Sequence, residues 1–398
     1  LSRLEPGLGL DIDAVPEGTV VFPYEPLLRV RGPLLAAQIV ETALLNLINF
    51  PTLVATNAAR VVLAAGGDAV LEFGLRRAQG PDGGLSASRA AYLGGCEATS
   101  NVLAGRLFGI PVRGTHAHSW ILSFSDEQEA MDTWAEVQPQ NTVLLVDTFD
   151  TLDGVRRAIE TGKRMREEGH ELDGIRLDSG DLAYLSREAR RLLDEAGFPD
   201  ARIVASSDLD PETIASLREQ GAEVDTWGVG TRLVTAYEQP ALGGVYKLAA
   251  VRRGPEEEWR MTVKVSADPD KTTVPGILGA RRYYDKAGRA AADMIHDTAS
   301  DSEPGDSVVD PVNPRRRKSI DPSWRQEELL VPTLRGGELV TELPDLATSR
   351  ARAQEQLASF HPGVLRRLNP HRYPAGLDIG LHRRREALVE SALEGRVG

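Results

Sequence analysis

Hydrophobic and polar positions follow two alternating periods through the centre of the chain. Short apolar runs of strand length are each followed by a polar cluster and then by a segment with apolar residues at helical spacing. The apolar runs are residues 69–75, 109–112, 142–146, 174–177, 202–206 and 225–229, and the helical segments include 151–169 and 210–222. Repeated alternation of strand and helix predicts a parallel sheet with helices outside it.

Each polar cluster comes directly after its strand, at the carboxyl end. In a closed (β/α) barrel the chemistry is built at that end, from side chains on several strands and their loops. The pattern supplies about six strand–helix units, fewer than the roughly eight of a complete barrel. We therefore predict an α/β fold in which an irregular (β/α) barrel carries the active site.

The two flanks of this region have different patterns. Residues 19–31 alternate apolar and polar positions and contain prolines, as short or edge strands do. Residues 33–67 have apolar residues at helical spacing, and Pro51 is predicted as a break between two helices. Farther along the chain, residues 257–266 and 280–295 are typical of antiparallel strands.

These flanks predict a second, smaller β-rich domain built from both sides of the barrel. We place the barrel at residues 37–242 and the β-rich domain at residues 1–36 together with 243–340. The amphipathic segment 345–360 belongs to a C-terminal helical segment, which we place at residues 341–398. With 398 residues, of which 41% are hydrophobic, the chain is long enough to bury two cores.

Charge and cysteine content narrow the range of partners. The formal net charge of −13 repels phosphate backbones, and the basic run 315–318 follows a stretch rich in Pro, Asp and Ser that is typical of a solvated loop. The single cysteine, Cys96, excludes an internal disulfide and a cysteine-rich zinc site. We therefore expect a cytoplasmic protein with no nucleic-acid partner.

A membrane partner is not expected either. No apolar segment approaches the roughly 20 residues that a membrane-spanning helix needs, and the opening residues LSRLEPGLGL do not resemble a signal peptide. The chain begins at Leu1 rather than at a methionine, and residues 11–30 already have the pattern of strands inside a domain. We expect that an N-terminal piece is missing.

Two histidines stand one residue apart in the stretch RGTHAHSWIL, residues 113–122. Residues i and i+2 of an extended segment point the same way, so His116 and His118 could begin the zinc site of a barrel hydrolase. Such a site needs further ligands, and no other histidine follows a predicted barrel strand. One catalytic histidine with a neighbour, or two histidines that only form hydrogen bonds in a loop, are the alternatives.

Acidic residues follow two of the predicted strands. Asp178 and Asp181 flank a turn in RLDSGDL, where one of them is expected to cap the next helix. Asp210 stands directly before Pro211 and is predicted as a helix N-cap, which leaves Asp208 free to point into the barrel mouth. Carboxylates there would suit a ribose diol or a magnesium ion that bridges phosphate oxygens.

Glycines, arginines and an aromatic residue add to these groups. Gly230 and Thr231 follow a late strand, where backbone N–H groups often bind a phosphate. Arg76 and Arg176 could bind an anion, since the planar guanidinium matches a carboxylate, and Phe73 offers an aromatic face. Together these groups suit a sugar phosphate that reacts with a small anionic aromatic compound.

Several stretches, in their joint order, carry a resemblance to a known family. They are FPYEPLLRV, ETALLNLINFPTL, EFGLRRAQGPDG, ATSNVLAGRLFGIPVRGTHAHSW, NTVLLVDTFDTLDGVRRAI, IRLDSGDL and DTWGVGTRLVT. The chain resembles the nicotinate phosphoribosyltransferases over nearly its whole length. The resemblance implies a type II phosphoribosyltransferase fold and an ATP-coupled reaction of NAD biosynthesis. In that reaction nicotinate and 5-phosphoribosyl 1-pyrophosphate give nicotinate mononucleotide and pyrophosphate.

The resemblance also implies roles for individual residues. The family's phosphorylated histidine lies in a Gly-Thr-x-Ala-His pattern, which makes His118 the candidate and puts His116 at the variable position. His118, Asp178 and Arg176 are expected to be catalytic. The residues expected to bind substrates are Phe73 (pyridine ring), Arg76 and Arg176 (carboxylate and pyrophosphate), Asp178 and Asp208 (ribose), Gly230 and Thr231 (5-phosphate), and Ser100, Thr115 and Ser207. Mg²⁺ and ATP are implied as cofactor and co-substrate, with no metal ligand assigned.

A base preference and a subunit arrangement are implied as well. Nicotinamide-using relatives carry an Asp near a GTDT motif, and the corresponding position here is Ser100, so we expect strong discrimination against nicotinamide. A homodimer with shared active sites is expected. Family members begin with a segment that has a tyrosine-containing ELTM-like motif and contributes to the nicotinate pocket. Nothing similar precedes Leu1, which again predicts a missing N-terminal piece.

Three other functions stay open from the sequence. A quinolinate- or nicotinamide-type phosphoribosyltransferase would use the same chemistry on a different base. A zinc-dependent barrel hydrolase would use His116 and His118 as ligands. A non-catalytic relative would bind the mononucleotide without making it. A panel of bases, the zinc content, and a comparison of binding with product formation distinguish them.

Overall fold

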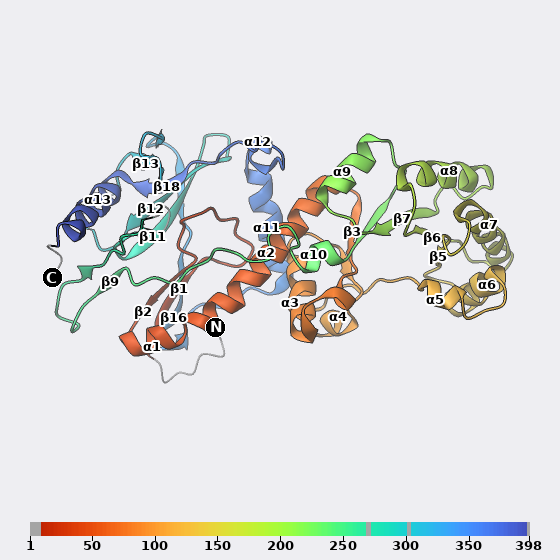
Figure 1. Cartoon of the computed structure of the whole chain (residues 1–398), viewed down its shortest axis with the longest axis horizontal. Helices are drawn as coiled ribbons and strands as arrows, with labels where there is room; N and C mark the ends of the chain where they lie inside the picture. The colour runs from red at the N-terminus through yellow and green to blue at the C-terminus, as the bar shows by residue number, and fades with distance from the viewer. Residues whose placement is uncertain (1–8, 268–271, 301–303, 396–398) are drawn as a thin grey trace. The chain divides into compact units, whose positions relative to one another are not determined.

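The computed structural model describes residues 9–267, 272–300 and 304–395. Two compact units divide the chain: one comprises Ile48–Gly243, and the other comprises Leu1–Leu47 together with Gly244–Gly398. The first unit contains a parallel sheet with helices packed on it, and the second is rich in β-strands (Figure 1). The chain therefore has the predicted α/β fold class with a separate β-rich unit.

The sheet of the Ile48–Gly243 unit contains six parallel strands in the order β4-β3-β8-β7-β6-β5. Five of them overlap a predicted strand, whereas the run 109–112 forms only an isolated parallel bridge between Thr99 and Val112. The strands are β3 (Ala69–Glu72), β4 (Ala98–Thr99), β5 (Val143–Leu145), β6 (Gly174–Leu177), β7 (Arg202–Ser207) and β8 (Thr226–Val229).

The first strand of this series lies beside the last. β3 pairs with β4 on one side and with β8 on the other. A barrel requires this pairing, because a sheet that winds around an axis brings its first and last strands together. Among the described residues no strand pairing joins β4 to β5. Closure into a complete barrel therefore stays a prediction.

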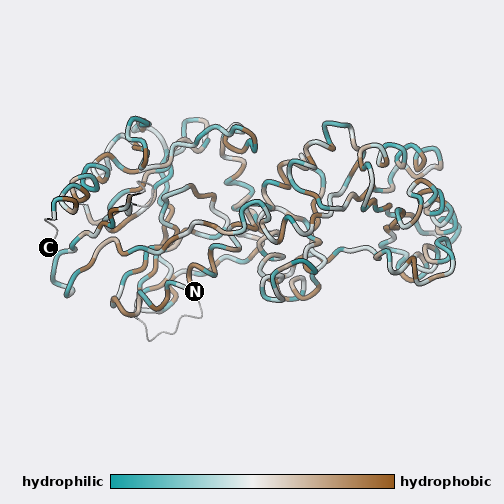
Figure 2. Tube along the Cα trace, in the orientation of Figure 1, coloured by the Kyte–Doolittle hydropathy of each residue, from teal (hydrophilic) through white to brown (hydrophobic). Residues whose placement is uncertain are grey.

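Helices cover this sheet where the sequence predicts them. Both α7 (Thr151–Glu167) and α8 (Leu182–Glu195) pack against β6, and each begins at an aspartate that accepts a hydrogen bond from a backbone N–H of the first turn, Asp150 and Asp181. Figure 2 shows the change from hydrophobic colour in the strands to hydrophilic colour along α7. The other helices are η2 (Leu75–Arg77), α3 (Gly80–Leu93), α4 (Val102–Phe108), α5 (His118–Ile121), α6 (Glu127–Val137), α9 (Pro211–Glu219) and α10 (Thr231–Val234).

The predicted helix break at Pro51 is wrong. Helix α2 (Glu41–Ala65) continues through this proline, and the break lies earlier, after α1 (Leu34–Ile39). Proline removes one hydrogen bond of a helix. Packing on both sides of the proline offsets that loss, because Leu44 is buried in one hydrophobic core and Val54 in another.

The expectation that no apolar segment is long enough to cross a membrane is also wrong for this region. The stretch Leu34–Ala65 is long and apolar enough by length and composition alone. A core helix passes the same test, and Val40, Leu44, Val54 and Ala58 are buried in the protein's own cores. The apolar positions of this stretch are therefore partly explained by packing within the protein.

The β-rich unit contains three sheets within its described residues. Their orders are β17-β16-β1-β2, β14-β13-β18-β12-β11-β15 and β10-β9. The strands are β1 (Asp11–Ala14), β2 (Leu28–Arg31), β9 (Ala250–Val251), β10 (Arg260–Met261), β11 (Leu278–Tyr284), β12 (Ala290–Asp297), β13 (Ser307–Val309), β14 (Arg317–Ser319), β15 (Arg325–Glu328), β16 (Val331–Arg335), β17 (Glu338–Leu339) and β18 (Ala375–Asp378). The helices of its C-terminal part are α11 (Leu346–Ser359), α12 (Pro362–Leu365) and α13 (Ile379–Leu393), with β18 between α12 and α13.

The predicted elements of the flanks are found in part. Strands β11 and β12 pair antiparallel where residues 280–295 predict strands, and α11 coincides with the predicted amphipathic helix. Residues 19–27 form no strand, because Pro23 and Pro26 lack the backbone donor that a ladder needs. The basic run is exposed as expected, but β14 occupies part of it, so it is not entirely a loop.

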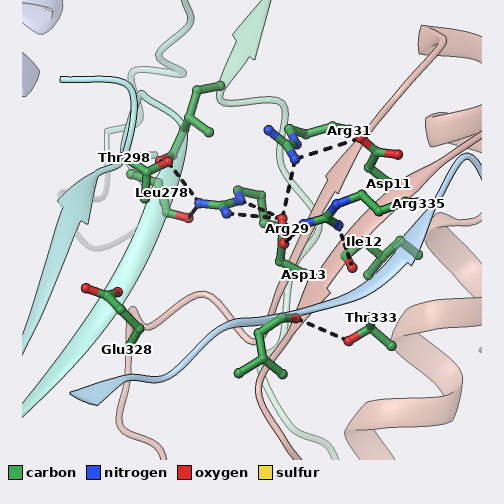
Figure 3. Close-up of polar contacts among 12 residues, drawn as sticks. Asp11, Ile12, Asp13, Arg29, Arg31, Leu278, Thr298, Glu328, Thr333 and Arg335 are labelled. Carbon is green, nitrogen blue, oxygen red and sulfur yellow. Dashed lines mark hydrogen bonds and ion pairs between the residues drawn. The ribbon is translucent and has the colours of Figure 1, made fainter. Parts of the chain in front are cut away.

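Charged side chains connect strands that lie far apart in the sequence within the β-rich unit. β1 pairs antiparallel with β2 and with β16. The buried carboxylate of Asp13 accepts hydrogen bonds from Arg29 Nε at 3.1 Å and from Arg335 Nη2 at 2.6 Å, although Arg335 is 322 positions away (Figure 3). Burial opposes ionisation of Asp13, but the two arginines outweigh it and lower the pKa of the carboxyl.

A second buried ion pair lies in the six-stranded sheet. Arg282 of β11 and Asp293 of β12 are both 0% exposed, and their Nη2 and Oδ2 atoms are 2.5 Å apart. Tyr373 donates a hydrogen bond to Asp293 at 2.9 Å, and Arg282 donates one to the backbone carbonyl of Val20 at 2.7 Å. The pair therefore also fixes the segment that follows β1.

Candidate active site

Arg176 lies at the centre of a polar cluster at the carboxyl ends of the parallel strands. Its Nε donates a hydrogen bond to Ser206 Oγ at 2.7 Å, its Nη1 to Thr115 Oγ1 at 2.9 Å, and its Nη2 to Asp178 Oδ1 at 2.7 Å. The arginine side chain is only 15% exposed. Three residues that the sequence selects, Thr115, Arg176 and Asp178, are thus brought together by the fold.

Asp178 is held in its ionised form by these neighbours. Burial opposes its ionisation, but the Arg176 guanidinium and a hydrogen bond from Ser206 outweigh this effect and lower the pKa of the carboxyl. Asp181, four residues from β6, instead caps α8 through a hydrogen bond from the Tyr184 backbone N–H. The prediction that one of the two aspartates is a cap is confirmed, and Asp178 is the one that belongs to the polar cluster.

His118 is the first residue of α5 and faces a buried carboxylate. Its Nε2 lies 3.2 Å from Oδ1 of Asp147. The histidine side chain is 39% exposed, whereas the aspartate side chain is 1% exposed. Oδ2 of Asp147 accepts hydrogen bonds from the backbone N–H of Asp178 at 3.0 Å and from Ser179 Oγ at 2.6 Å. A carboxylate fixed in this way can orient the imidazole while the rest of the ring stays accessible.

His116 has an environment of its own. It is 4% exposed, and its Nε2 accepts a hydrogen bond from the backbone N–H of Leu145 at 3.1 Å. Its ring packs edge-on against Trp134, with centroids 5.1 Å apart. Burial lowers the pKa of His116 to about 4, so the ring is neutral near pH 7. The two histidines have separate partners, which removes the support for a shared zinc ion.

Phe73 lies beside the Arg176 guanidinium. It follows β3, and its ring centroid is 5.9 Å from Cζ of Arg176. Gly228 of β8 makes room for the ring, because a Cβ at that position would come within 2.7 Å of it. An aromatic face next to a guanidinium is suited to a flat ring that carries a negative charge.

A buried glutamate holds the loop that carries Phe73. Glu72 is 1% exposed and accepts hydrogen bonds from Ser88 Oγ at 2.8 Å, from Thr99 Oγ1 at 2.6 Å and from the Gly74 backbone N–H. Its backbone carbonyl accepts a hydrogen bond from Ser100 N–H at 2.9 Å. Glu72 therefore connects the segments that carry Phe73 and Ser100.

Gly230 and Thr231 reach the same edge of the sheet. The Phe73 backbone N–H donates to the carbonyl of Val229 at 2.8 Å, so the ends of β3 and β8 are adjacent. A Cβ on Gly74 would lie 2.9 Å from the carbonyl oxygen of Gly230, and a larger residue would force the two segments apart. The candidate phosphate loop thus lies next to the aromatic residue.

Three other selected residues are not tied to the Arg176 cluster by a hydrogen bond or ion pair in the part of the chain that the structure describes. Arg76 is exposed in η2, and Ser207 is exposed at the end of β7. Asp208 is not free, because Arg232 Nε donates to its Oδ2 at 3.0 Å, and its side chain is 62% exposed. Arg232 also contacts Asp210, which caps α9 as predicted.

One acidic group has the spacing of a metal site. Ligand atoms of Asp210, Glu212 and Glu238 lie within 4.8 Å of one another. The Asp210 carboxylate is already engaged by the first turn of α9 and by Arg232, and the two glutamates are exposed. We assign no metal to this group.

Comparison with known proteins places the chain in a family. The profile described as "Nicotinate phosphoribosyltransferase (NAPRTase) family" matches residues 69–281, and the profile described as "Nicotinate phosphoribosyltransferase C-terminal domain" matches residues 279–384. The nicotinate phosphoribosyltransferase of Bacillus subtilis (strain 168) is 43% identical over 367 residues, which cover 91% of this chain and 74% of that protein. The chain belongs to the nicotinate phosphoribosyltransferase family.

Solved structures agree with this membership of the nicotinate phosphoribosyltransferase family. The crystal structure of human nicotinic acid phosphoribosyltransferase superposes with a TM-score of 0.80 at 33% identity, covering 96% of this chain and 82% of the human chain. Nicotinate-nucleotide pyrophosphorylase from Pyrococcus furiosus superposes with a TM-score of 0.66 at 25% identity, covering 88% and 81%. The likeness to both spans the parallel-sheet unit and most of the β-rich unit.

For a nicotinate phosphoribosyltransferase, Asp147 and Ser206 are among the polar residues of this site that reasoning from the sequence missed. Asp147 opens the cluster DTFD after the strand at 142–146, in the same position that Asp178 holds after its own strand. That placement was a usable signal for Asp147. Ser206 lies inside a predicted strand, and only the contact with Arg176 and Asp178 reveals its part in the site.

Proposed function

We propose that this protein is an active, ATP-coupled nicotinate phosphoribosyltransferase of the ligase class. It would join nicotinate and 5-phosphoribosyl 1-pyrophosphate into nicotinate mononucleotide and pyrophosphate, with His118 phosphorylated by ATP in each cycle. The observation that carries the proposal is the contact between the partly exposed His118 and the buried Asp147, beside the Arg176 cluster. Family membership supplies the substrates.

The contact with Asp147 supports phosphorylation of His118. The carboxylate accepts a hydrogen bond from Nε2–H, so the lone pair of the ring is on Nδ1. Nδ1 attacks the γ-phosphorus of ATP, the bond from that phosphorus to the β,γ-bridging oxygen breaks, and ADP leaves. Asp147 balances the positive charge that develops on the ring. Hydrolysis of the resulting N–P bond then favours pyrophosphate formation.

The transfer step needs orientation more than acid–base catalysis. The pyridine nitrogen attacks C1 of the ribose, and the bond from C1 to the pyrophosphate oxygen breaks. Arg176 and Phe73 would hold the nicotinate carboxylate and ring, a role that their proximity supports, and Arg76 would face the pyrophosphate from η2. The ionised Asp178 stabilises positive charge on the ribose and holds its hydroxyls.

The phosphoribosyl group would lie along the ends of β7 and β8. Gly230 and Thr231 would bind the 5-phosphate, and Ser207 and Thr115 would line the same edge. Asp208 would bind a ribose hydroxyl after exchanging its present partner, Arg232. The released guanidinium could then face a phosphate, which its planar donor geometry suits.

Magnesium is part of this proposal. Carboxylate oxygens at the strand ends fit its preference for hard oxygen ligands, and Asp178 and Asp208 are the residues that would hold it. When bound, it neutralises charge on pyrophosphate and ATP phosphates.

We also propose a homodimer in the cytoplasm. Helix α4 supports a dimer, because it exposes Val102, Leu103 and Leu107, which are 69%, 55% and 56% accessible.

The first test is phosphoryl transfer to the protein. Purified protein is incubated with γ-³²P-labelled ATP and magnesium, and acid-labile label on the chain is counted. We expect label on the wild type and on His170→Ala, and none on His118→Ala. A folded wild-type protein that takes up no label would contradict the phosphohistidine mechanism.

A panel of bases tests the substrate. We expect product from nicotinate, because Ser100 brings no negative charge near the base, and strong discrimination against nicotinamide. Ser100→Asp should weaken nicotinate binding through charge repulsion. Comparable turnover of nicotinate and nicotinamide by the wild type would contradict the assignment.

A further inference from the structure

His116 has no part in the proposed reaction, yet its contact is specific. Directly after β5, the N–H of Val146 points towards β6 and donates to the Arg176 carbonyl at 3.2 Å, so the N–H of Leu145 points the other way. That outward N–H donates to Nε2 of His116 at 3.1 Å. A histidine side chain thus accepts the hydrogen bond of a backbone N–H at the edge of β5, which a neighbouring strand would otherwise accept.

The segment that carries His116 is fixed at its other end to β4. The Thr99 N–H donates to the Pro111 carbonyl at 3.0 Å, and the Arg113 N–H donates to the Thr99 carbonyl at 3.1 Å. Residues 111–118 therefore run from the edge of β4 to the edge of β5. Within this run, His116 provides the hydrogen bond to the β5 backbone.

The two histidines are two residues apart, and so are the two residues that they contact at this edge. His116 contacts Leu145, and His118 contacts Asp147. A shift of one residue in this alignment would put Ala117 or Ser119 opposite the carboxylate. The His116 hydrogen bond thus lies two residues before the His118–Asp147 contact, both along this segment and along the end of β5.

We propose that His116 is a positioning residue, which aligns the 113–118 segment with β5 so that His118 faces Asp147. This inference rests on the proposed phosphorylation of His118 for its functional meaning. His116 needs a neutral Nε2 to accept the Leu145 N–H, and its ring proton is then on Nδ1, which lies 3.5 Å from the Ala117 carbonyl. Burial keeps the ring in this neutral form.

A matched pair of amide substitutions isolates the hydrogen bond. The Oε1 atom of His116→Gln reaches about as far as Nε2 and can accept the Leu145 N–H, whereas the carbonyl of His116→Asn is one bond shorter and cannot. Both are neutral and polar, so they differ mainly in reach. His116→Leu, which removes the acceptor altogether, is the third variant.

The first measurement is the rate of His118 labelling by γ-³²P-labelled ATP. We expect His116→Gln to stay within about 3-fold of the wild type, and His116→Asn and His116→Leu to lose on the order of 10- to 100-fold, because a misplacement of about 1 Å at a reacting group has effects of that size. Labelling of all three variants at the wild-type rate would overturn the inference.

A double-mutant cycle separates positioning from a general loss of structure. If His116 acts through the His118–Asp147 contact, His116→Asn should cost little further rate when Asp147 is already replaced in Asp147→Asn. Independent, multiplying losses would contradict the inference. Thermal unfolding of each variant shows whether it is folded. If His116→Asn and His116→Leu are not folded, a large loss of labelling in folded His116→Gln would contradict the inference.

A second readout needs no turnover. In protein labelled with ¹⁵N-histidine, NMR follows the tautomer of the His118 ring, assigned with His118→Ala. We expect His116→Asn to change the His118 tautomer ratio, and His116→Gln to leave it close to the wild type. If the wild type accepts no label but this pattern holds, the proposed function fails and the positioning role stands. An unchanged His118 ring in a folded His116→Asn protein overturns the positioning role.

Discussion

Buried carboxylates have different partners in the two units. In the Ile48–Gly243 unit, Asp147 and Glu72 accept hydrogen bonds from backbone N–H groups, hydroxyls and one histidine. In the β-rich unit, Asp13 and Asp293 are paired with arginines. The first arrangement leaves a reactive side chain, His118, partly exposed. The second satisfies the charges within the protein and joins segments that are distant in the sequence.

The partners of a buried carboxylate indicate whether it contributes mainly to activity or mainly to stability. A carboxylate that accepts N–H and hydroxyl donors fixes loop geometry and orients another group, so its loss should reduce activity more than stability. A carboxylate paired with arginine in a dry core leaves an uncompensated charge when one partner is removed, so its loss should reduce stability. The four substitutions that follow test this contrast.

Asp147→Asn should have the largest effect. The amide can present its NH₂ group to His118 and favour the wrong tautomer, so we expect kcat of the ATP-coupled reaction to fall on the order of 10³- to 10⁴-fold. The melting temperature should change little. Asp150→Asn is the control, because asparagine also caps α7 and kcat should stay near the wild type. A large loss of stability in Asp147→Asn with near-normal kcat would break the comparison.

Arg282→Met should mainly reduce stability. Removal of the guanidinium leaves Asp293 buried and unpaired, which costs about 3–5 kcal/mol in the free energy of unfolding. Urea unfolding measures this change, and labelling of His118 in the folded protein should be preserved. Arg289→Met is the matched control, since its pair with Asp285 lies at the surface, where water screens it, and its loss should change stability little. Equal losses in the two variants would argue against a special role for burial.

Asp13→Asn should cost about 1–3 kcal/mol near pH 7, because Arg29, Arg335 and the more distant Arg31 lose their charged partner. The pKa of Asp13 is lowered in the folded protein from its ordinary 3.8, so its stabilising contribution is present above that pH and is lost as the pH falls further. Unfolding midpoints of wild type and variant should therefore converge below about pH 3.8. A difference that grows in acid would contradict this linkage.

Glu72→Gln should have the smallest effect, and it should act on substrate binding. The amide still fills the space but places an NH₂ group near donors, which disturbs the loop that carries Phe73. We expect KM for nicotinate to rise about 3- to 10-fold with little change in kcat. Glu97→Gln, at an exposed position, is the control and should match the wild type. A change in kcat alone would contradict a role in positioning the base.

The parallel sheet and the residues at its strand ends were predictable to a large extent. Strand length, period and the polar residues after each strand are local signals, and they point to Asp178, Arg176 and Phe73, whereas Thr115 is implied by the family motif. The helix caps at Asp181 and Asp210 were likewise predictable, because a cap depends on a few neighbouring residues.

Other features were wrong or invisible in the sequence. Helix α2 continues through Pro51 because packing on both sides of the proline outweighs one lost hydrogen bond. Asp208 is paired with Arg232, a residue of the next strand–helix unit, and no local pattern reveals that partner. Ser206 looked like an ordinary strand residue until the sheet placed it beside Arg176.

The sequence by itself determined the alternation of strands and helices, the polar ends of the strands and the family motifs, because these depend on period and order along the chain. Only the tertiary structure decided which histidine meets Asp147 and how Asp13 finds Arg335 across 322 positions. The physical reason is that hydrogen bonds and ion pairs depend on distances of a few ångströms in space. Sequence separation does not fix such distances until the sheets have formed.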